Sequence, residues 1–294
     1  MGGLFMRYRI ITDSTGDLTP ELVRELDLTV IPMEFTVDGK SYHNYPDGHE
    51  MSAKAFYDLL RSGKTSTTAQ INSQEFVEWA DPMLQAGEDL LYIAFSSGLS
   101  GTCQSALLAK QELSEKYPDR KIYVADSLCA SMGEGLLVYY AAKMQQEGKS
   151  IDEVYQWVQD NKLHLCHWFT VDDLNHLKRG GRVSPAAALF GTMLGIKPVL
   201  HVDDAGHLIP VAKIRGRRQS LDALVAHMEE TVTNPENQVI FISHGDCLED
   251  AQYVADKIRS KWNVKDIVLN EIGPVIGTHS GPGTVALFFL GTKR

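Results

Sequence analysis

Three turns rich in hydroxyl or carboxyl side chains each separate an apolar run from a helix-like run. The first contains Asp13 and Ser14, the second is the stretch 95–102 (FSSGLSGT), and the third contains Asp126 and Ser127. The first N–H groups of a helix lack partners inside the helix, and the helix dipole favours negative charge beside them. These turns therefore predict an anion-binding site with hydroxyl donors. The structural alternative for each turn is an ordinary helix cap.

The apolar runs before these turns predict buried strands, and the runs after them predict helices. Successive strands joined by helices are parallel with right-handed crossovers, so their carboxyl ends meet along one edge of a sheet. Open α/β sheets bind ligands at this edge. The sequence therefore predicts an α/β lobe with a mainly parallel sheet that brings the three turns together.

The rest of the chain predicts a second α/β lobe. From residue 163 the pattern changes to short strands, two short helices around Gly180-Gly181, and a hairpin that turns at 204–206. The segment 266–291 predicts a strand, a glycine-rich loop and a last strand. We expect an N-terminal lobe over residues 1–158 and a C-terminal lobe with a mixed sheet over residues 159–294.

Local signals predict where several elements begin. Asp38-Gly39 predicts a tight hairpin turn. Asn72, with Glu75 three residues later, predicts a variant of the capping box at the start of a helix. Asp246 is expected to cap the helix that follows it, with a contribution of about 1 kcal/mol.

The composition argues against some classes of function. The 294-residue chain has a formal net charge of −10, whereas nucleic-acid binding relies on an excess of Lys and Arg. Its four cysteines lie far apart and show no metal-ligand spacing, so we expect reduced thiols and no metal site. The most apolar region, 183–202, is interrupted by Lys197 and Pro198 before it reaches the roughly 20 residues that cross a bilayer. With no leader at its start, the chain is expected to be cytoplasmic and to need no cofactor.

His279 and Arg182 are candidate anion-binding side chains outside the three turns. His279 stands in GTHSGPG, where glycines expose backbone N–H groups, and a histidine can bond an anion whether neutral or charged. Arg182 follows Gly180-Gly181, which restricts the backbone before it. The structural alternatives are a loop histidine bonded to carbonyl groups and an arginine on a solvated face.

Two basic clusters stand out in this acidic chain. Such clusters can bind phosphate or dock a partner, which makes a protein-interaction module one hypothesis. A solvated charged face is the commoner explanation for the second cluster. The first cluster is Lys178, Arg179 and Arg182, and the second is Lys213, Arg215, Arg217 and Arg218.

A serine-dependent hydrolase of acyl or phosphate esters is the enzymatic alternative. Ser97 and Ser100 are its candidate nucleophiles, but Thr102 replaces the last glycine of the G-x-S-x-G elbow. Ser100, Asp246 and His279 do occur in the chain order of a hydrolase triad. Because any chain contains many such triples, order alone carries little weight.

Several motifs together resemble the DegV family, from about Tyr8 to the C-terminus. In chain order they are DSTGDL, KTS, SSGLSGT, FTVDDLNHLKRGGRVS, IKPVL and GPVIGTHSGPG. The resemblance implies an α/β/α lobe and a second, two-layer α/β lobe, with a long-chain fatty acid bound between them. In some bacteria such proteins are the lipid-carrying subunit of a fatty-acid kinase and present the carboxylate to a separate ATP-binding subunit.

The resemblance also implies which residues hold the ligand. The implied fatty-acid-binding residues are Thr65, Ser96, Ser97, Gly98, Arg182 and His279. Of these, Thr65 and Ser97 would hydrogen-bond the carboxylate, while Arg182 and His279 would border the head group. The chain reads Thr-Ser-Thr-Thr-Ala at 65–69 where the family often has Thr-Ser-Gln-Pro-Ser, and loss of the proline is expected to loosen this loop.

An acyl chain needs an apolar enclosure, since each buried CH₂ contributes about 0.8 kcal/mol. The segment 186–195 (AAALFGTMLG) is a candidate tunnel wall or an ordinary core helix. The chain has neither a P-loop nor a kinase motif set, so phosphoryl transfer would need a partner. We therefore expect a non-catalytic fatty-acid-binding protein that serves lipid transport or presents its ligand to a kinase subunit.

Overall fold

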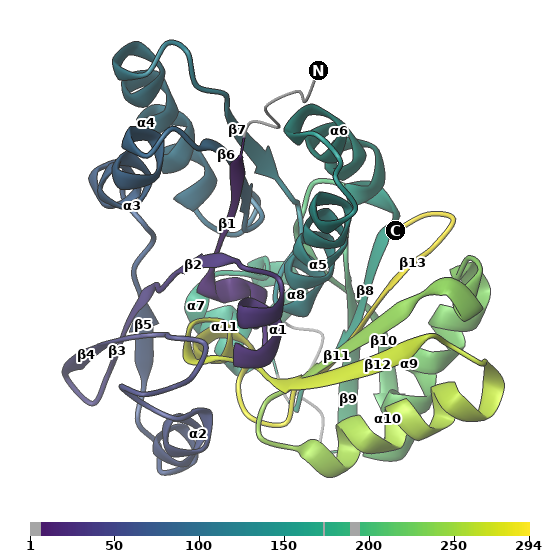
Figure 1. Cartoon of the computed structure of the whole chain (residues 1–294). Helices are drawn as coiled ribbons and strands as arrows, with labels where there is room; N and C mark the ends of the chain where they lie inside the picture. The colour runs from purple at the N-terminus through teal and green to yellow at the C-terminus, as the bar shows by residue number, and fades with distance from the viewer. Residues whose placement is uncertain (1–6, 173, 189–194) are drawn as a thin grey trace.

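The computed structural model describes residues 7–172, 174–188 and 195–294, and it has two α/β lobes, each built around its own sheet (Figure 1). The sheet of the first lobe has the strand order β2-β1-β6-β7 and is entirely parallel. The three polar turns follow β1, β6 and β7, so they lie along one edge as predicted. The strands are β1 (Tyr8–Asp13), β2 (Thr29–Ile31), β6 (Asp89–Ala94) and β7 (Ile122–Asp126).

Helices and a small antiparallel sheet complete the first lobe. The helices are α1 (Pro20–Glu25), α2 (Ala53–Arg61), α3 (Ser73–Gln85), α4 (Thr102–Lys116), α5 (Met132–Gln146) and α6 (Ile151–Asn161), with a 3-10 turn η1 (Ser14–Gly16). The small sheet has the order β4-β3-β5. Its strands are β3 (Glu34–Val37), β4 (Lys40–His43) and β5 (Ser66–Thr68).

The second lobe contains the predicted mixed sheet, in the order β10-β9-β8-β13-β11-β12. Strands β11 and β12 pair in parallel, and the other neighbours pair antiparallel. The strands are β8 (Leu165–Thr170), β9 (Ile196–Val202), β10 (Leu208–Arg215), β11 (Val239–His244), β12 (Asp266–Glu271) and β13 (Val285–Leu290). The helices are α7 (Asn175–Gly180), α8 (Pro185–Ala188), α9 (Arg217–Thr231), α10 (Leu248–Lys261) and α11 (Pro274–Ser280), with 3-10 turns η2 (Lys162–His164) and η4 (Pro235–Asn237).

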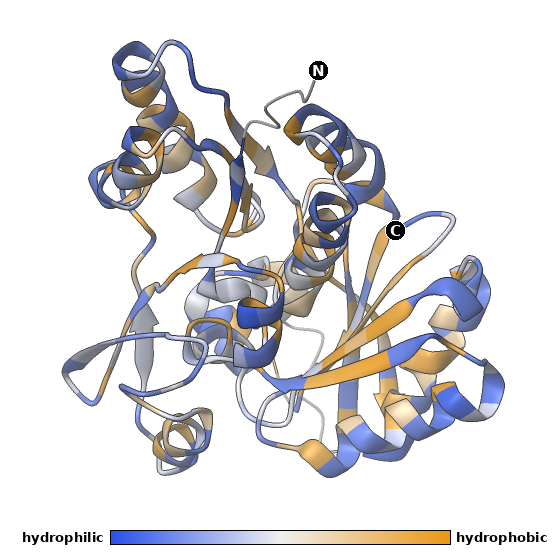
Figure 2. Cartoon of the chain, viewed as in Figure 1, coloured by the Kyte–Doolittle hydropathy of each residue, from blue (hydrophilic) through white to orange (hydrophobic). Residues whose placement is uncertain are grey.

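Helix α5 lies between the two sheets and belongs to both cores. It contacts β1 and β6 of the first sheet and β8, β11 and β13 of the second. Leu136, Leu137 and Val138 are completely buried, and one hydrophobic cluster joins them to Ile10 and Phe288. Helices α9 and α10 cover the opposite face of the second sheet, and Figure 2 shows much of their outer surface as hydrophilic. The shared core around α5 therefore fixes how the lobes sit relative to each other.

Local signals correctly predicted several element ends. Asp38 and Gly39 have φ values of 52° and 72°, as a tight turn between β3 and β4 requires. Asn72 and Glu75 form a reciprocal capping box at the start of α3. Gly181 ends α7 in the left-handed conformation, so the predicted pair of short helices around Gly180-Gly181 is confirmed.

Two predictions about local structure are wrong. Asp246 is not the N-cap of α10, because its φ of 52° is left-handed and its carboxylate bonds Arg61 instead. The glycine-rich segment before β13 is not simply a loop, because α11 places His279 on a helix. Pro274 at the first turn and Gly281, with φ 80° just after the last, are the residues that favour such a short helix.

The predicted division into residues 1–158 and 159–294 stays a prediction. A boundary after residue 158 falls inside α6, whereas the last strand of the first sheet ends at Asp126 and the first strand of the second begins at Leu165. The candidate tunnel wall at 186–195 lies mostly outside the described residues.

The carboxyl group of Glu134 is completely buried in the first turn of α5. Thr12 Oγ1 lies 3.1 Å from the carbonyl of Ile93 and 2.6 Å from Glu134 Oε1. The Thr12 hydroxyl donates toward both acceptors, which share its single hydrogen. Burial, followed by the charge of Asp13, raises the pKa of Glu134 well above its ordinary value. The core around Glu134 therefore favours the protonated form of this carboxyl group.

The raised pKa of Glu134 predicts a pH-dependent stability. A raised pKa means that the folded state holds a proton that the unfolded state loses above the ordinary glutamate pKa, so stability falls as pH rises beyond that value. We expect Glu134→Gln to reduce this slope, which can reach about 1.4 kcal/mol per pH unit for one group. Urea unfolding at about pH 5 and about pH 8 measures the difference.

The exposed Glu25 provides the matched control, because its ion pair with Lys143 lies at the surface. Glu25→Gln should leave the pH slope unchanged and change stability by no more than about 0.5 kcal/mol. An unchanged slope in Glu134→Gln would show that Glu134 is ionised in the folded protein.

Candidate functional site

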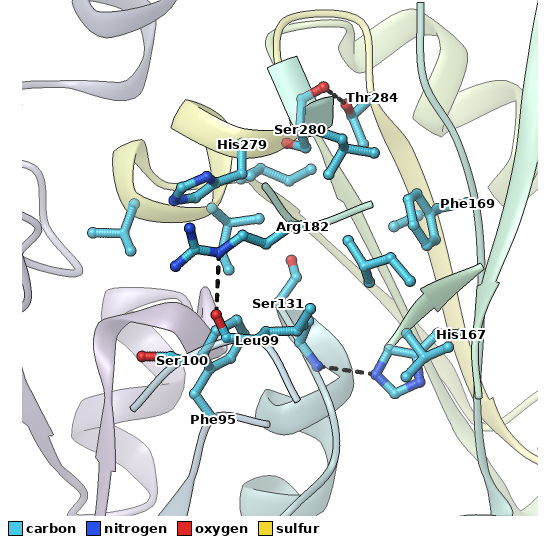
Figure 3. Close-up of a pocket in the computed structure, with 18 of the residues that line it drawn as sticks. Phe95, Leu99, Ser100, Ser131, His167, Phe169, Arg182, His279, Ser280 and Thr284 are labelled. Atoms are coloured by element: carbon cyan, nitrogen blue, oxygen red, sulfur yellow. Dashed lines mark hydrogen bonds between the residues drawn. The ribbon is translucent and has the colours of Figure 1, made fainter. Parts of the chain in front are cut away.

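A cavity of about 290 Å³ lies between the two lobes, and both lobes contribute to its lining (Figure 3). Most of the lining is apolar. These side chains are Met33, Phe95, Leu99, Ala130, Phe169, Leu177, Val202, Leu208, Ile272, Val275, Ile276, Ala286 and Phe288. Such a cavity can enclose a largely hydrophobic ligand.

The side chain of Arg182 places a positively charged guanidinium group at this mostly apolar cavity. Arg182 follows α7, and its Nε donates to the carbonyl of Leu99 at 3.1 Å while Nη1 donates to the carbonyl of Gly180. No ion pair joins it to a carboxylate among residues 7–172, 174–188 and 195–294. Burial lowers the pKa of Arg182, but a guanidinium stays charged at neutral pH. The cavity therefore offers a half-buried positive charge suited to an anion.

His279 lies beside this charge on α11. Its Nε2 is 2.9 Å from Thr68 Oγ1 on β5, and its Nδ1 is buried without a hydrogen-bond partner among the described residues. Burial first, and then the charge of Arg182, lowers the pKa of His279 to about 4. The ring is therefore neutral at physiological pH and can donate or accept one hydrogen bond at each nitrogen according to its tautomer.

Glycine is required where α7 meets this histidine. A Cβ atom on Gly180 would lie 2.1 Å from His279 Nδ1, which is far inside van der Waals contact. The absence of a side chain at this position thus lets Arg182 and His279 approach each other.

The turn after β6 closes one wall of the cavity. Ser96 is fully buried, and its Oγ donates to the carbonyl of Gly206 in the β9–β10 hairpin. A Cβ on Gly98 would lie 2.7 Å from the carbonyl oxygen of Ala205. The polar turn of the first lobe and the hairpin of the second lobe are therefore packed directly together.

The structure places the predicted ligand-binding residues at different distances from the cavity. Arg182 and His279 line it, together with Ser100. Gly98 lines a neighbouring groove that shares Leu99, Arg182 and Leu208 with the cavity. Ser96 is buried in the lobe contact, and Ser97 is exposed with its amide bonded to Asp126.

Thr65 is exposed and outside the cavity lining, whereas Thr68 lines the cavity. The sequence analysis missed Thr68. Side chains of β5 alternate in exposure, with Ser66 and Thr68 partly buried and Thr67 exposed between them. Because the sequence has a hydroxyl residue at each of positions 65–68, no local sequence pattern distinguishes Thr68 from Thr65.

The structure does not assemble the hydrolase triad. Asp246 binds Arg61, and His279 is bonded to Thr68 rather than to a carboxylate. Ser100 Oγ lies 3.0 Å from Thr102 Oγ1. Although these residues occur in the order of a triad, within the described part of the chain Ser100 has no histidine base and His279 has no orienting carboxylate, as a serine nucleophile needs.

Part of the second basic cluster is engaged within the protein. Arg217 pairs with Asp250 and donates to the carbonyl of Gly283, and Arg218 lies 3.9 Å from the centre of the Tyr253 ring. Arg217 and Arg218 therefore make structural contacts within the protein.

Within the described ranges, no group of three or more His, Cys, Asp or Glu side chains is arranged to hold a metal ion. Among those same residues, no helix is both long and apolar enough to cross a bilayer.

Comparison with known proteins agrees with this geometry. The family model described as "Uncharacterised protein, DegV family" matches residues 7–292. A DegV domain-containing protein of Clostridium perfringens is 50% identical over 288 residues, covering 98% of this chain and 99% of the relative.

Solved structures of similar proteins share the fold. A DegV family protein from Thermus thermophilus, described as binding fatty acid, has a TM-score of 0.88 at 28% identity and covers 97% of this chain and 100% of that one. DegV of Bacillus subtilis, described as a fatty acid binding protein, has a TM-score of 0.84 at 27% identity and covers 98% of this chain and 100% of that one. With its motifs, its two-lobe fold and its full-length relatives in agreement, the chain belongs to the DegV family.

Proposed function

We propose that this protein binds a long-chain fatty acid in the cavity between its lobes. The observation that carries the proposal is the half-buried Arg182 guanidinium, which has no carboxylate partner among the described residues and faces a mostly apolar cavity. A carboxylate would pair with this charge, and an alkyl chain would remove the apolar lining from water. Fatty-acid binding by the relatives from Thermus thermophilus and Bacillus subtilis supports this ligand class.

In this proposal the carboxylate lies among Arg182, His279, Thr68 and Ser100. Arg182 supplies charge, and the three other side chains supply neutral hydrogen-bonding groups. The geometry favours Thr68 over Thr65, because Thr68 lines the cavity and contacts His279. The resemblance-based roles of Thr65, Ser96, Ser97 and Gly98 remain the competing assignment.

We also propose that the protein is a non-catalytic carrier that presents its ligand to a separate ATP-binding kinase subunit in the cytoplasm. The absence of a P-loop from the sequence supports the need for a partner. All four cysteines are unpaired, which suits a reducing compartment. Formation of an acyl phosphate from the loaded protein only after such a subunit and ATP are added would test the carrier role.

The ligand itself can be identified directly. Native mass spectrometry of freshly purified protein, followed by organic extraction, should reveal one fatty acid per chain. If no fatty acid is released and none is taken up on addition, the proposal fails.

Replacing the charged group should weaken binding strongly. We expect Arg182→Ala to raise the dissociation constant for hexadecanoic acid by about 10-fold to 100-fold, because a hydrogen bond to a charged partner is lost. Arg182→Lys should retain part of the affinity, since an ammonium keeps the charge but not the planar fork. Competition with a labelled fatty acid measures both effects.

Arg218 is the matched control, because it is an exposed arginine that stacks on Tyr253 outside the cavity. Arg218→Ala should leave the affinity unchanged. Equal losses in Arg182→Ala and Arg218→Ala would mean that the effect comes from overall charge and not from the cavity.

A pair of threonine variants distinguishes the two carboxylate sites. Thr68→Val should lower the affinity for hexadecanoic acid several-fold, because it removes a hydroxyl from the cavity while keeping the side-chain shape. Thr65→Val should have no effect, since Thr65 is exposed. The reverse result would move the carboxylate to the site that the family resemblance implies.

A further inference from the structure

The end of α11 brings a second pair of hydroxyl groups to the cavity. Ser280 and Thr284 both line it, and only 7% and 2% of their surfaces are exposed. Figure 3 shows the two residues next to each other, while the ring of His279 extends away from Thr284. The cavity therefore contains polar groups besides those assigned to the carboxylate.

These two hydroxyls differ in what they can still bond. Thr284 Oγ1 donates to the carbonyl oxygens of Ser280 and Gly281, at 3.0 Å and 2.9 Å, so its single hydrogen is used. Ser280 Oγ is buried and has no hydrogen-bond partner among the described residues. Together they offer one free donor and two free acceptors to whatever fills the cavity.

An unsubstituted alkyl chain does not satisfy these groups. A buried hydroxyl left without a partner destabilises the complex, and methylene groups cannot hydrogen-bond. A hydroxyl group on the ligand could accept from Ser280 and donate to Thr284. The complementary ligand is thus an acyl chain that carries its own hydroxyl group.

The position of Ser280 beside His279 indicates where this hydroxyl would lie along the acyl chain. The two residues are consecutive, so their Cα atoms are about 3.8 Å apart, while their side chains point in different directions from α11. With the carboxylate at His279 and Arg182, a ligand hydroxyl that bonds Ser280 would therefore be carried close to the carboxyl group.

We propose that the cavity accommodates a fatty acid with a hydroxyl group near its carboxyl end, a β-hydroxy acid, through Ser280 and Thr284. The proposal rests on the proposed function and narrows its ligand class. A cavity with only apolar groups at this point would instead disfavour the hydroxylated chain.

Three ligands of one chain length test the idea: hexadecanoic acid, its β-hydroxy derivative and its ω-hydroxy derivative. We expect the wild-type protein to bind the β-hydroxy acid at least as tightly as the parent acid. In Ser280→Ala the β-hydroxy acid should become about tenfold weaker relative to the parent, because its hydroxyl loses a partner. The affinity for the ω-hydroxy acid, relative to that for hexadecanoic acid, should be the same in the wild type and in Ser280→Ala.

Ser100→Ala is the matched control, since it removes a cavity hydroxyl at the proposed carboxylate end. It should weaken all three ligands by a similar factor and leave their ratios unchanged. Because Ser280 Oγ makes no hydrogen bond within the described residues, Ser280→Ala should also keep the thermal stability of the wild type.

Two results would overturn the proposal. One is that the affinity for the β-hydroxy acid relative to that for the parent acid is the same in Ser280→Ala as in the wild type. The other is an equal loss of affinity for all three ligands, which would make Ser280 part of the carboxylate site. Failure of the wild type to bind any of the three acids would instead reject the proposed function itself.

Discussion

The position of α5 between two sheets is the constraint on which the site depends. Both sheets bury hydrophobic residues against this helix, so neither lobe can move away without exposing its core. At the start of α5, Ser131 lines the cavity with φ 52° and ψ −145°, a strained conformation for a residue with a side chain. Its hydroxyl bonds Asp17 of the first lobe and contacts Ser243 of the second, which holds this conformation in place.

The buried acidic groups and the half-buried arginine respond differently to burial. Burial in the shared core raises the pKa of Glu134 well above its ordinary value, and it raises the pKa of Asp17 to about 7. Arg182 cannot lose its proton at neutral pH and instead lies half-buried at the cavity between the lobes. The core thus contains acids whose neutral form is favoured by burial, whereas the cavity contains a permanent cation.

Much of the scaffold could be predicted from the sequence, because it depends on local patterns. Strand-turn-helix units placed three polar turns on one sheet edge, and hairpin and capping signals gave the correct ends for β3, β4 and α3. The site was less predictable. His279 and Arg182 were singled out from nearby glycines, but Thr68 was missed and Asp246 was given the wrong role, since both contacts join segments far apart in the chain.

The sequence by itself determined the family, the two-lobe α/β architecture and the polar turns, because periodicity, caps and motifs are local properties of the chain. Tertiary structure alone decided which hydroxyls reach the cavity. Thr65 and Thr68 lie three residues apart, yet one faces solvent and the other faces His279 from α11. The physical reason is that successive side chains of a strand point to opposite faces. Helix α11 of the second lobe packs against β5, so only one face of β5 lies toward the cavity.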